Sequence, residues 1–387
     1  MPTRFSRVAA AVLFAGSAIA FLSQPAWAGF IYVQSNLVSN GAVPAANTDP
    51  NLINPWGLAF SATSPFWVSD QGTGVATLYS GAGVAIPLVV SIPSGSTPPT
   101  GPTGQVFNSA PTGSFPVSGT SAKFIFDTLS GTIDAWNAGT TAAVEATTAG
   151  AVYTGLALDN ASTSYYLYAA NSAGTGSIDV YDSNFNKVTL SGDFVDPNAI
   201  AGYVPFNIQN IGGTLYVEYA ELGPTGIPIA GSTGYVDEFD SSGNFITRLT
   251  SGGALDAPWG ITLAPATGFG TFSGDLLIGN FGNGEINAFN PTTGAFLGTL
   301  TNASGAPIVN QYLWALDFGN GGTGFSSTSL YFTAGVNNQT GGLFGSIAAV
   351  ATPEPATLPI AAVGLLSILL VGLRKETRTK TGRPRHT

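Results

Sequence analysis

The sequence predicts an all-β fold, a six-bladed β-propeller with four-stranded blades, on three observations. Only 8% of the 387 residues are charged, whereas 51 are Gly and 25 are Pro, a composition that disfavours long solvated helices. A Pro-x-Gly-aliphatic motif recurs, and its third residue stands at 57, 104, 155, 207, 260 and 315. Each unit of about 50 residues contains several short β-branched or aromatic runs separated by turn residues. Four strands in such a unit are typical of a propeller blade.

The motif opens each unit and predicts the first strand of each blade. Tyr153 and Leu313 replace its Pro in the third and sixth units, and Asn207 replaces its Gly in the fourth. Later runs predict the second, third and fourth strands. The clearest second runs are 66–70, 123–127, 167–171 and 276–280, the third runs end near 79, 136, 181, 239 and 289, and the fourth are clearest at 245–249 and 296–300.

The sixth unit lacks its own fourth strand. It has runs near 329–333 and 343–350 and then reaches the C-terminal segment, whereas residues 30–37 form an apolar run before the first unit. We therefore expect the N-terminal strand to close the last blade, which leaves no unpaired edge where the ring joins.

The first 28 residues have the pattern of a secretory signal peptide. Arg4 and Arg7 precede an apolar stretch, and Ala26-Trp27-Ala28 fits the small-x-small cleavage rule. Cleavage after Ala28 by signal peptidase would leave 29–352 as the propeller domain and would export it.

The last 35 residues carry a second signal. Pro353-Glu354-Pro355 precedes an apolar span at 356–373 and a basic tail at 374–387, an arrangement also compatible with a plain C-terminal membrane anchor. The segment resembles the PEP-CTERM sorting signal of Gram-negative bacteria, whose hydrophobic region is also called the ice-binding protein C-terminal domain. This resemblance implies recognition by an exosortase near 353–355, a transmembrane helix at 356–373, and delivery to the cell envelope or exterior.

The repeat itself resembles NHL-type repeats. With the Asn54-Pro55-Trp56-Gly57 opening and the tail, the whole chain resembles an uncharacterised family of exported bacterial proteins. The resemblance implies a propeller and no particular activity.

Charge and composition exclude several functions. Residues 29–352 contain 19 acidic and three basic residues, a net charge of −16, so nucleic-acid binding is not expected. The chain has no Cys, and its single His is His386, near the end. Disulfides, thiolate zinc sites and catalysis by a histidine within the fold are therefore excluded.

Polar residues at the ends of the second strands are candidate ligands for Ca²⁺ or another divalent cation. Equivalent positions lie on a ring around a propeller axis, and carboxylate and amide oxygens suit a hard cation. At fold level the set resembles the central metal site of six-bladed lactonases, although such residues also commonly cap turns. The candidates are Asp70, Asp127, Asn171 and Asn280, with Tyr219 or Glu218 and Gly335 as counterparts in the fourth and sixth units.

Residues in the first strands are further candidates. Gln105, Asp159 and Asp317 follow the motif and would face the channel. Trp56, Trp259 and Trp314 share one repeat position, where they would either stack on sugars or form apolar wedges between blades.

Three functions fit these observations. The leading hypothesis is a non-catalytic propeller of the envelope or extracellular matrix that binds a polysaccharide or an envelope protein and requires no cofactor. The alternatives are a divalent-metal-dependent hydrolase or lactonase with carboxylates at the channel mouth, and a purely structural surface protein.

Overall fold

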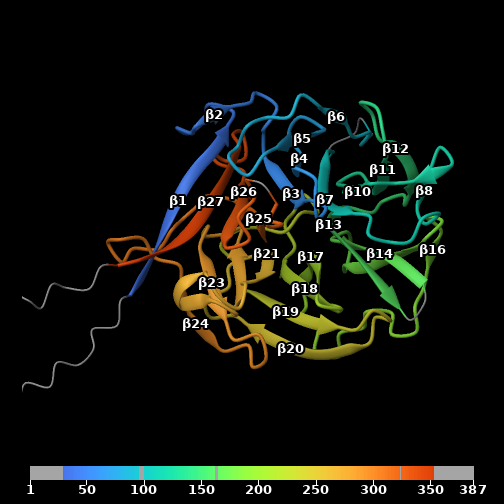
Figure 1. The fold of residues 1–387 in the computed structure, drawn as a ribbon. Coiled ribbons are helices and arrows are strands. Elements are labelled where there is room, and N and C mark those ends of the chain that lie inside the picture. Colours follow the sequence, from blue (N-terminus) through green and yellow to red (C-terminus); the bar gives the residue numbers. More distant parts are fainter. Residues whose placement is uncertain (1–28, 96–99, 162–163, 323, 353–387) are drawn as a thin grey trace, which may run out of the picture. The chain divides into compact units, whose positions relative to one another are not determined.

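Six four-stranded blades surround a common axis in the computed structural model, which describes residues 29–95, 100–161, 164–322 and 324–352 (Figure 1). Residues 30–351 form one compact unit. The strands of each blade are given from the inside outwards. Blade one has β3 (Pro55–Ala59), β4 (Phe66–Asp70), β5 (Val75–Tyr79) and β6 (Val90–Ser91), and blade two has β7 (Pro102–Phe107), β10 (Phe124–Thr128), β11 (Thr132–Trp136) and β12 (Ala143–Thr147). Blade three has β13 (Tyr153–Ala161), β14 (Ser164–Asn171), β15 (Ser177–Asp182) and β16 (Lys187–Val188), and blade four has β17 (Tyr203–Ile211), β18 (Thr214–Glu221), β19 (Gly234–Phe239) and β20 (Phe245–Ser251). Blade five has β21 (Pro258–Leu263), β22 (Leu276–Asn280), β23 (Ile286–Phe289) and β24 (Phe296–Thr299), and blade six has β25 (Leu313–Phe318), β26 (Ser329–Ala334), β27 (Leu343–Ala351) and β1 (Phe30–Ser39).

The prediction of six four-stranded blades is confirmed. Short elements decorate them, namely β2 (Asn47–Thr48), the hairpin β8 (Pro116–Val117) with β9 (Thr120–Ser121), and a 3₁₀ turn at Gly270–Phe272. That turn is the one helical element in the part of the chain that the structure describes.

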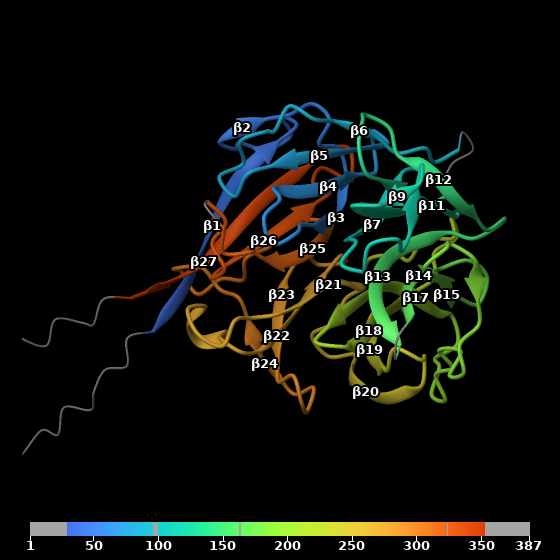
Figure 2. The same ribbon diagram turned by 45° about the vertical axis from the view of Figure 1, so that its right-hand side comes forward.

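The N-terminal strand closes the last blade, as predicted. β1 pairs antiparallel with β27 from Phe30 opposite Ala351 to Ser39 opposite Leu343, with one bulge near Asn36 (Figures 1 and 2). Strands from the two ends of the domain therefore complete one sheet. On its other side β1 pairs with the short parallel strand β2, and the backbone N–H of Tyr32 donates to the Thr301 carbonyl oxygen at 3.0 Å.

The innermost strands close into a ring. Each innermost strand contacts the next one along the chain, from β3 through β7, β13, β17 and β21 to β25, and β25 contacts β3 (Figure 1). Apolar side chains fill the spaces between neighbouring blades, for example where Trp67 of blade one stacks on Phe124 of blade two at 4.3 Å between ring centroids. The core is therefore distributed around the ring rather than gathered at one centre.

The two terminal signals lie outside the described residues. They include the leader 1–28 with its cleavage position Ala28, the motif Pro353, Glu354 and Pro355, and the expected span 356–373. Among the residues with described positions, no helix is long and apolar enough to cross a membrane.

Candidate functional site

The second residue of the repeat motif in each innermost strand contributes to a plug across the channel. Four of the six are aromatic, and the stacked pair Trp56 and Trp314 has ring centroids 3.5 Å apart. Trp259 meets both rings edge-on at 6.0 and 5.6 Å, and Phe206 packs against the same pair. The three tryptophans are at most 4% exposed, so their faces are not available to a sugar. They converge on one another, which corrects the expectation of separate wedges between blades.

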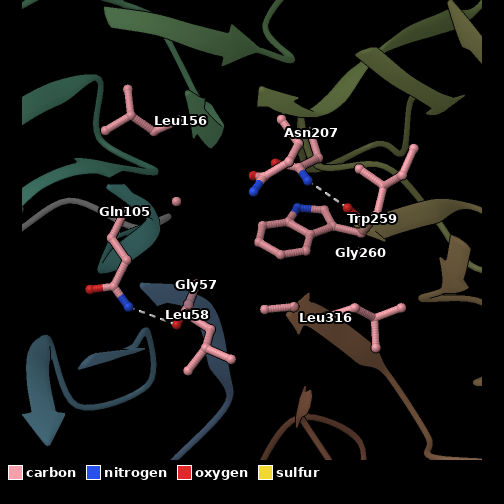
Figure 3. A pocket seen from close by; sticks show the side chains of 12 residues that line it. Gly57, Leu58, Gln105, Leu156, Asn207, Trp259, Gly260 and Leu316 are labelled. Carbon is pink, nitrogen blue, oxygen red and sulfur yellow. Dashed lines mark hydrogen bonds between the residues drawn. The ribbon is translucent and has the colours of Figure 1, made fainter. Parts of the chain in front are cut away.

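The third residue of the repeat motif sets how closely adjacent innermost strands approach each other. A Cβ added to Gly57, Gly104 or Gly260 would lie closer than 3.0 Å to backbone atoms of the next innermost strand. In blade four the position is occupied by Asn207, whose Nδ2 donates to the Trp259 carbonyl oxygen at 2.5 Å and to Glu218 Oε2 at 3.0 Å. The channel at this level is a cavity of about 20 Å³, room for about one water molecule (Figure 3).

The fifth residue of the motif lines a wider mouth in five of the six blades, on the side away from the plug. This mouth is a cavity of about 230 Å³. Blades one to three contribute the apolar residues Ala59, Val106 and Ala157, whereas blades four and six contribute Gln209 and Asp317. At the fifth position the mouth is therefore polar on one side and apolar on the other, and Gln105 and Ser109 of blade two add two polar side chains on the apolar side.

Two side chains, those of Asp317 and Gln209, offer hydrogen-bonding groups in the polar half of the mouth. The Asp317 carboxylate accepts a hydrogen bond from the backbone N–H of Phe318 at 2.8 Å, and burial raises its pKa to about 7. Among the described residues, the Gln209 amide has no hydrogen-bond partner. A carboxyl with a shifted pKa and a free amide in one pocket are features of a binding site.

Gln105 and Asp317 line the mouth, as predicted, but Asp159 does not. The Gln105 amide also reaches back into blade one, where its Nε2 donates to the carbonyl oxygens of Gly57 and Trp67 at 2.8 and 2.7 Å. Gln209 was not predicted, although aligning the fifth motif residue of the six units would have identified it.

The predicted metal ligands have separate partners. Asp70 accepts from Thr77 Oγ1 at 2.7 Å and Asp127 accepts from Thr103 Oγ1 at 2.7 Å. The side-chain Oδ1 of Asn171 accepts from the backbone N–H of Val152 at 3.0 Å. Asn280 Nδ2 donates to the Ala254 carbonyl oxygen at 2.8 Å. Within the described ranges, no three His, Cys, Asp or Glu side chains form a group that could hold a metal. A single ion shared by the four residues stays a prediction.

The strand register corrects their assumed equivalence. The first residue of the repeat motif lies opposite Asp70, Thr128, Asn171, Tyr219, Asn280 and Ala334 in blades one to six. Asp127 and Glu218 come one residue earlier and Gly335 one later, and neighbouring side chains on a strand point to opposite faces. The predicted set therefore mixes two faces of the blades.

Several buried carboxyls lack cationic partners. Burial raises the pKa of Asp127 to about 7, despite hydrogen bonds from Thr103 and the Gly104 backbone, and that of Asp134 to about 8. Glu218 is fully buried, and its pKa is also raised. One oxygen each of Asp70, Asp127 and Asn280 is buried with no hydrogen-bond partner among the described residues. Asp134 was not predicted as a candidate, although polar residues recur at its position in the third strands.

Known proteins resemble this chain in sequence and in fold. No family model matches it. Two solved structures share the fold alone: a protein of unknown function from Bacteroides thetaiotaomicron (10% identity, TM-score 0.52, 83% of this chain and 76% of that one) and an α-L-arabinofuranosidase from Fusarium graminearum solved with an iminosugar inhibitor (12% identity, TM-score 0.51, 81% and 97%).

Two relatives come from Acanthamoeba polyphaga mimivirus. "Uncharacterized protein R648" is 35% identical over 335 residues, which cover 80% of this chain and 78% of the viral protein. "Uncharacterized protein L690" is 33% identical over 327 residues, which cover 80% of this chain and 84% of the viral protein. The chain belongs to the family represented by these two mimivirus proteins.

Proposed function

We propose that this chain is a binding propeller whose channel mouth takes a small neutral ligand with one hydrogen-bonding side and one apolar side. The observation that carries the proposal is the divided ring at the fifth position, with Gln209 and Asp317 facing the mouth from one side and Ala59, Val106 and Ala157 from the other. A sugar ring has this division, since its hydroxyls lie at the edge and its C–H groups on the faces. A monosaccharide unit of a glycan is the ligand class we propose.

The electrostatics of the mouth support a neutral ligand. Asp317 is the one titratable side chain among its lining residues, and no cation faces it. An anionic ligand would meet this carboxyl and the strongly acidic domain around it, with no base to offset the repulsion. The plug closes the channel behind the site, so a ligand would enter and leave by the same opening.

We further propose that the domain reaches the cell surface or exterior through the two terminal signals. The sequence patterns at 1–28 and 353–387 support processing by signal peptidase and an exosortase. Mass spectrometry of the protein isolated from its producing cells tests this proposal. We expect a mature N-terminus at Gly29 and a C-terminus near Pro353–Pro355. Retention of both intact termini would contradict it.

A divalent-metal-dependent hydrolase is the second candidate. It is favoured by the buried oxygens of Asp70, Asp127 and Asn280 that have no hydrogen-bond partner within the described part of the chain. Such oxygens could accept a metal ion in place of a donor.

Calorimetric titration of the full chain with neutral monosaccharides and with their uronic acid counterparts tests the binding proposal. We expect saturable binding of a neutral sugar, no binding of its acid, and about tenfold weaker binding in Gln209→Ala. Asn184→Ala is the matched control, because Asn184 is an exposed amide in a turn of blade three, away from the mouth. Equal binding by Gln209→Ala, or a preference for the uronic acid, would rule out the site.

A further inference from the structure

A second groove lies where the N-terminal strand closes the ring. Its cavity of about 390 Å³ is lined by β1, by the loop that precedes β25 and by the turn between β26 and β27. All of its lining residues are uncharged, and five carry an amide side chain. It shares no lining residue with the channel mouth, so a ligand in this groove would bind independently of the proposed mouth ligand.

A chain of amides crosses this groove. Gln34 and Asn310 bond reciprocally, since Gln34 Nε2 donates to Asn310 Oδ1 and Asn310 Nδ2 donates to Gln34 Oε1, both at 2.9 Å. Gln34 Nε2 also donates to Asn36 Oδ1 at 2.9 Å. These bonds fix the amide orientations before any ligand arrives. They also leave Asn310 with one N–H and one lone pair to offer, a donor and an acceptor on one buried side chain.

One wall of the groove has a strained backbone conformation. Asn337, Asn338 and Gln339 are three consecutive non-glycine residues with positive φ, at 56°, 54° and 64°. The turn is fastened by the Gln339 N–H, which donates to the Gly335 carbonyl oxygen at 2.7 Å, and by Tyr312, whose hydroxyl donates to Asn338 Oδ1 at 3.3 Å. Strained backbone that the surroundings hold in place is concentrated at ligand sites.

The rest of the lining is aliphatic. Val43, Val336 and Leu343 lie beside the amides, and Val309 stands at the rim with 52% of its surface exposed. A ligand matching this groove would present a carbonyl oxygen to the free N–H of Asn310 and a methyl group to the valines and leucine. An acetamido group has both parts.

We propose that this groove binds an N-acetylhexosamine unit of a neutral glycan. The acetamido carbonyl oxygen accepts a hydrogen bond from Asn310 Nδ2, and the methyl group on the same carbon packs on the aliphatic residues. Sugar hydroxyls reach the other lining amides, Asn36, Gln311 and Asn337. A hexose without the acetamido group leaves the Asn310 edge unmatched.

Titration of the full chain with tetra-N-acetylchitotetraose and with cellotetraose tests the proposal. We expect cellotetraose to bind about tenfold or more weakly than the acetylated sugar. Asn310→Leu should weaken chitotetraose binding by a similar factor. Because Asn310 is buried and its loss could disturb folding, Val309→Trp is the second variant: it fills the groove from an exposed position and should also abolish tight binding. Gln209→Ala, in the mouth, should bind chitotetraose as the unmodified chain does.

Three results would overturn the proposal. They are the absence of chitotetraose binding, equal affinity for the two sugars, and binding that survives Val309→Trp. If binding survives Val309→Trp but is lost in Gln209→Ala, the sugar occupies the mouth. In that case the groove assignment fails while the proposed function stands.

Discussion

The glycines of the innermost strands act as spacers between blades. Each lies where the next innermost strand comes closest, and its lack of a side chain allows that approach. The repeated Gly in the sequence is therefore a packing requirement of the ring. Blade six shows that the requirement is local, because Ala315 occupies the same position there.

We expect Gly104→Ala to destabilise the protein by about 2–4 kcal/mol. The new Cβ would lie closer than 3.0 Å to the Leu156 backbone N, which cannot move without shifting blade three. Ala315→Gly is the control and should cost about 1 kcal/mol, since it only removes a methyl group from a strand. Urea unfolding of the two variants measures the difference. Equal midpoints would show that the ring is looser than the structure indicates.

A buried carboxyl should make stability depend on pH. The folded protein keeps Asp134 protonated up to a pKa of about 8, whereas the unfolded chain releases that proton near pH 4. Between these values unfolding releases a proton, so rising pH favours the unfolded state. We expect the free energy of unfolding to fall by about 4 kcal/mol from pH 5 to pH 8.5. Denaturant titrations at these two pH values measure the fall.

Asp134→Asn isolates this contribution. Asn fits the position, because blade five has Asn287 there, and it cannot ionise. The variant should lose much of the pH dependence and should be the more stable protein at pH 8.5. An unchanged slope would assign the effect to other buried carboxyls whose pKa values are also raised, namely Asp70, Asp127, Glu218 or Asp317.

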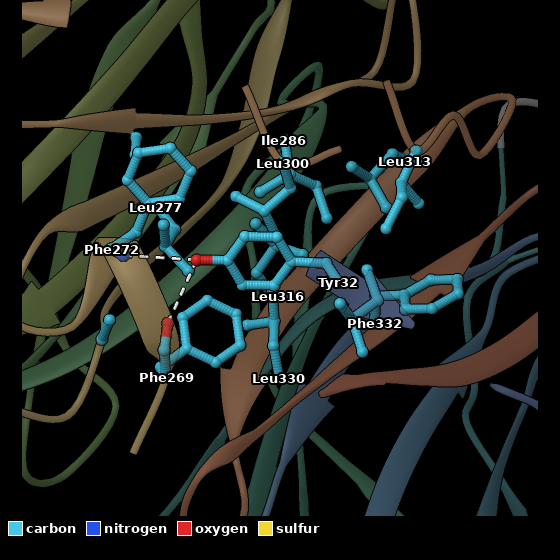
Figure 4. Close-up of a cluster of buried hydrophobic side chains, with 14 of the residues drawn as sticks. Tyr32, Phe269, Phe272, Leu277, Ile286, Leu300, Leu313, Leu316, Leu330 and Phe332 are labelled. Carbon is cyan, nitrogen blue, oxygen red and sulfur yellow. Dashed lines mark hydrogen bonds between the residues drawn. The ribbon is translucent and has the colours of Figure 1, made fainter. Parts of the chain in front are cut away.

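At the scale of the strand, β1 does more than pair with β27. Tyr32 inserts between blades five and six, where its ring stacks on Phe272 at 5.8 Å between centroids (Figure 4). Its hydroxyl donates to the Phe269 carbonyl oxygen at 3.1 Å and accepts from the Phe272 N–H at 3.2 Å. The closing strand is therefore fastened both by its edge and by side chains, Tyr32 here and Gln34 through Asn310.

Substitutions of Tyr32 separate packing from hydrogen bonding. Tyr32→Ala should cost about 3–5 kcal/mol, because it opens a cavity between two blades. Tyr32→Phe keeps the ring and should cost only about 1–2 kcal/mol for the two lost hydrogen bonds. Thermal unfolding of both variants measures the split. A large loss in Tyr32→Phe alone would place the main contribution in the hydroxyl.

Strand positions were predicted from the sequence better than strand register. The Pro-x-Gly openings and apolar runs identified the blades and the closing strand, because each is a local pattern. Asp127 was aligned with Asp70 because both follow an apolar run, yet the pairing of Thr128 with Pro102 places Asp127 one residue earlier. That pairing joins distant segments, and no local pattern records it.

At the scale of the whole molecule, the six-fold ring turns repeat positions into layers along the axis. Aromatic residues at the second position meet as a plug, and the fifth position forms a mouth of divided polarity. Neither arrangement is visible in one blade, since each needs residues from at least four. The sequence contained the equivalent positions, but their convergence depends on how far the ring narrows at each level.

The register also decides what to expect of divalent ions. A shared axial ion would need Asp70, Asp127, Asn171 and Asn280 to converge, but Asp127 points to the face opposite the other three. Each of the four already has a hydrogen-bond partner. We therefore expect the full chain to melt at the same temperature in EDTA and in millimolar Ca²⁺, Mg²⁺ or Mn²⁺. An ion bound only by the native state would add about 2.7 kcal/mol at a hundredfold excess over Kd, a rise of several degrees. A saturable rise lost in Asp70→Asn but kept in Asp182→Asn, a turn carboxylate in blade three, would instead establish a metal site and favour the hydrolase over the binding propeller.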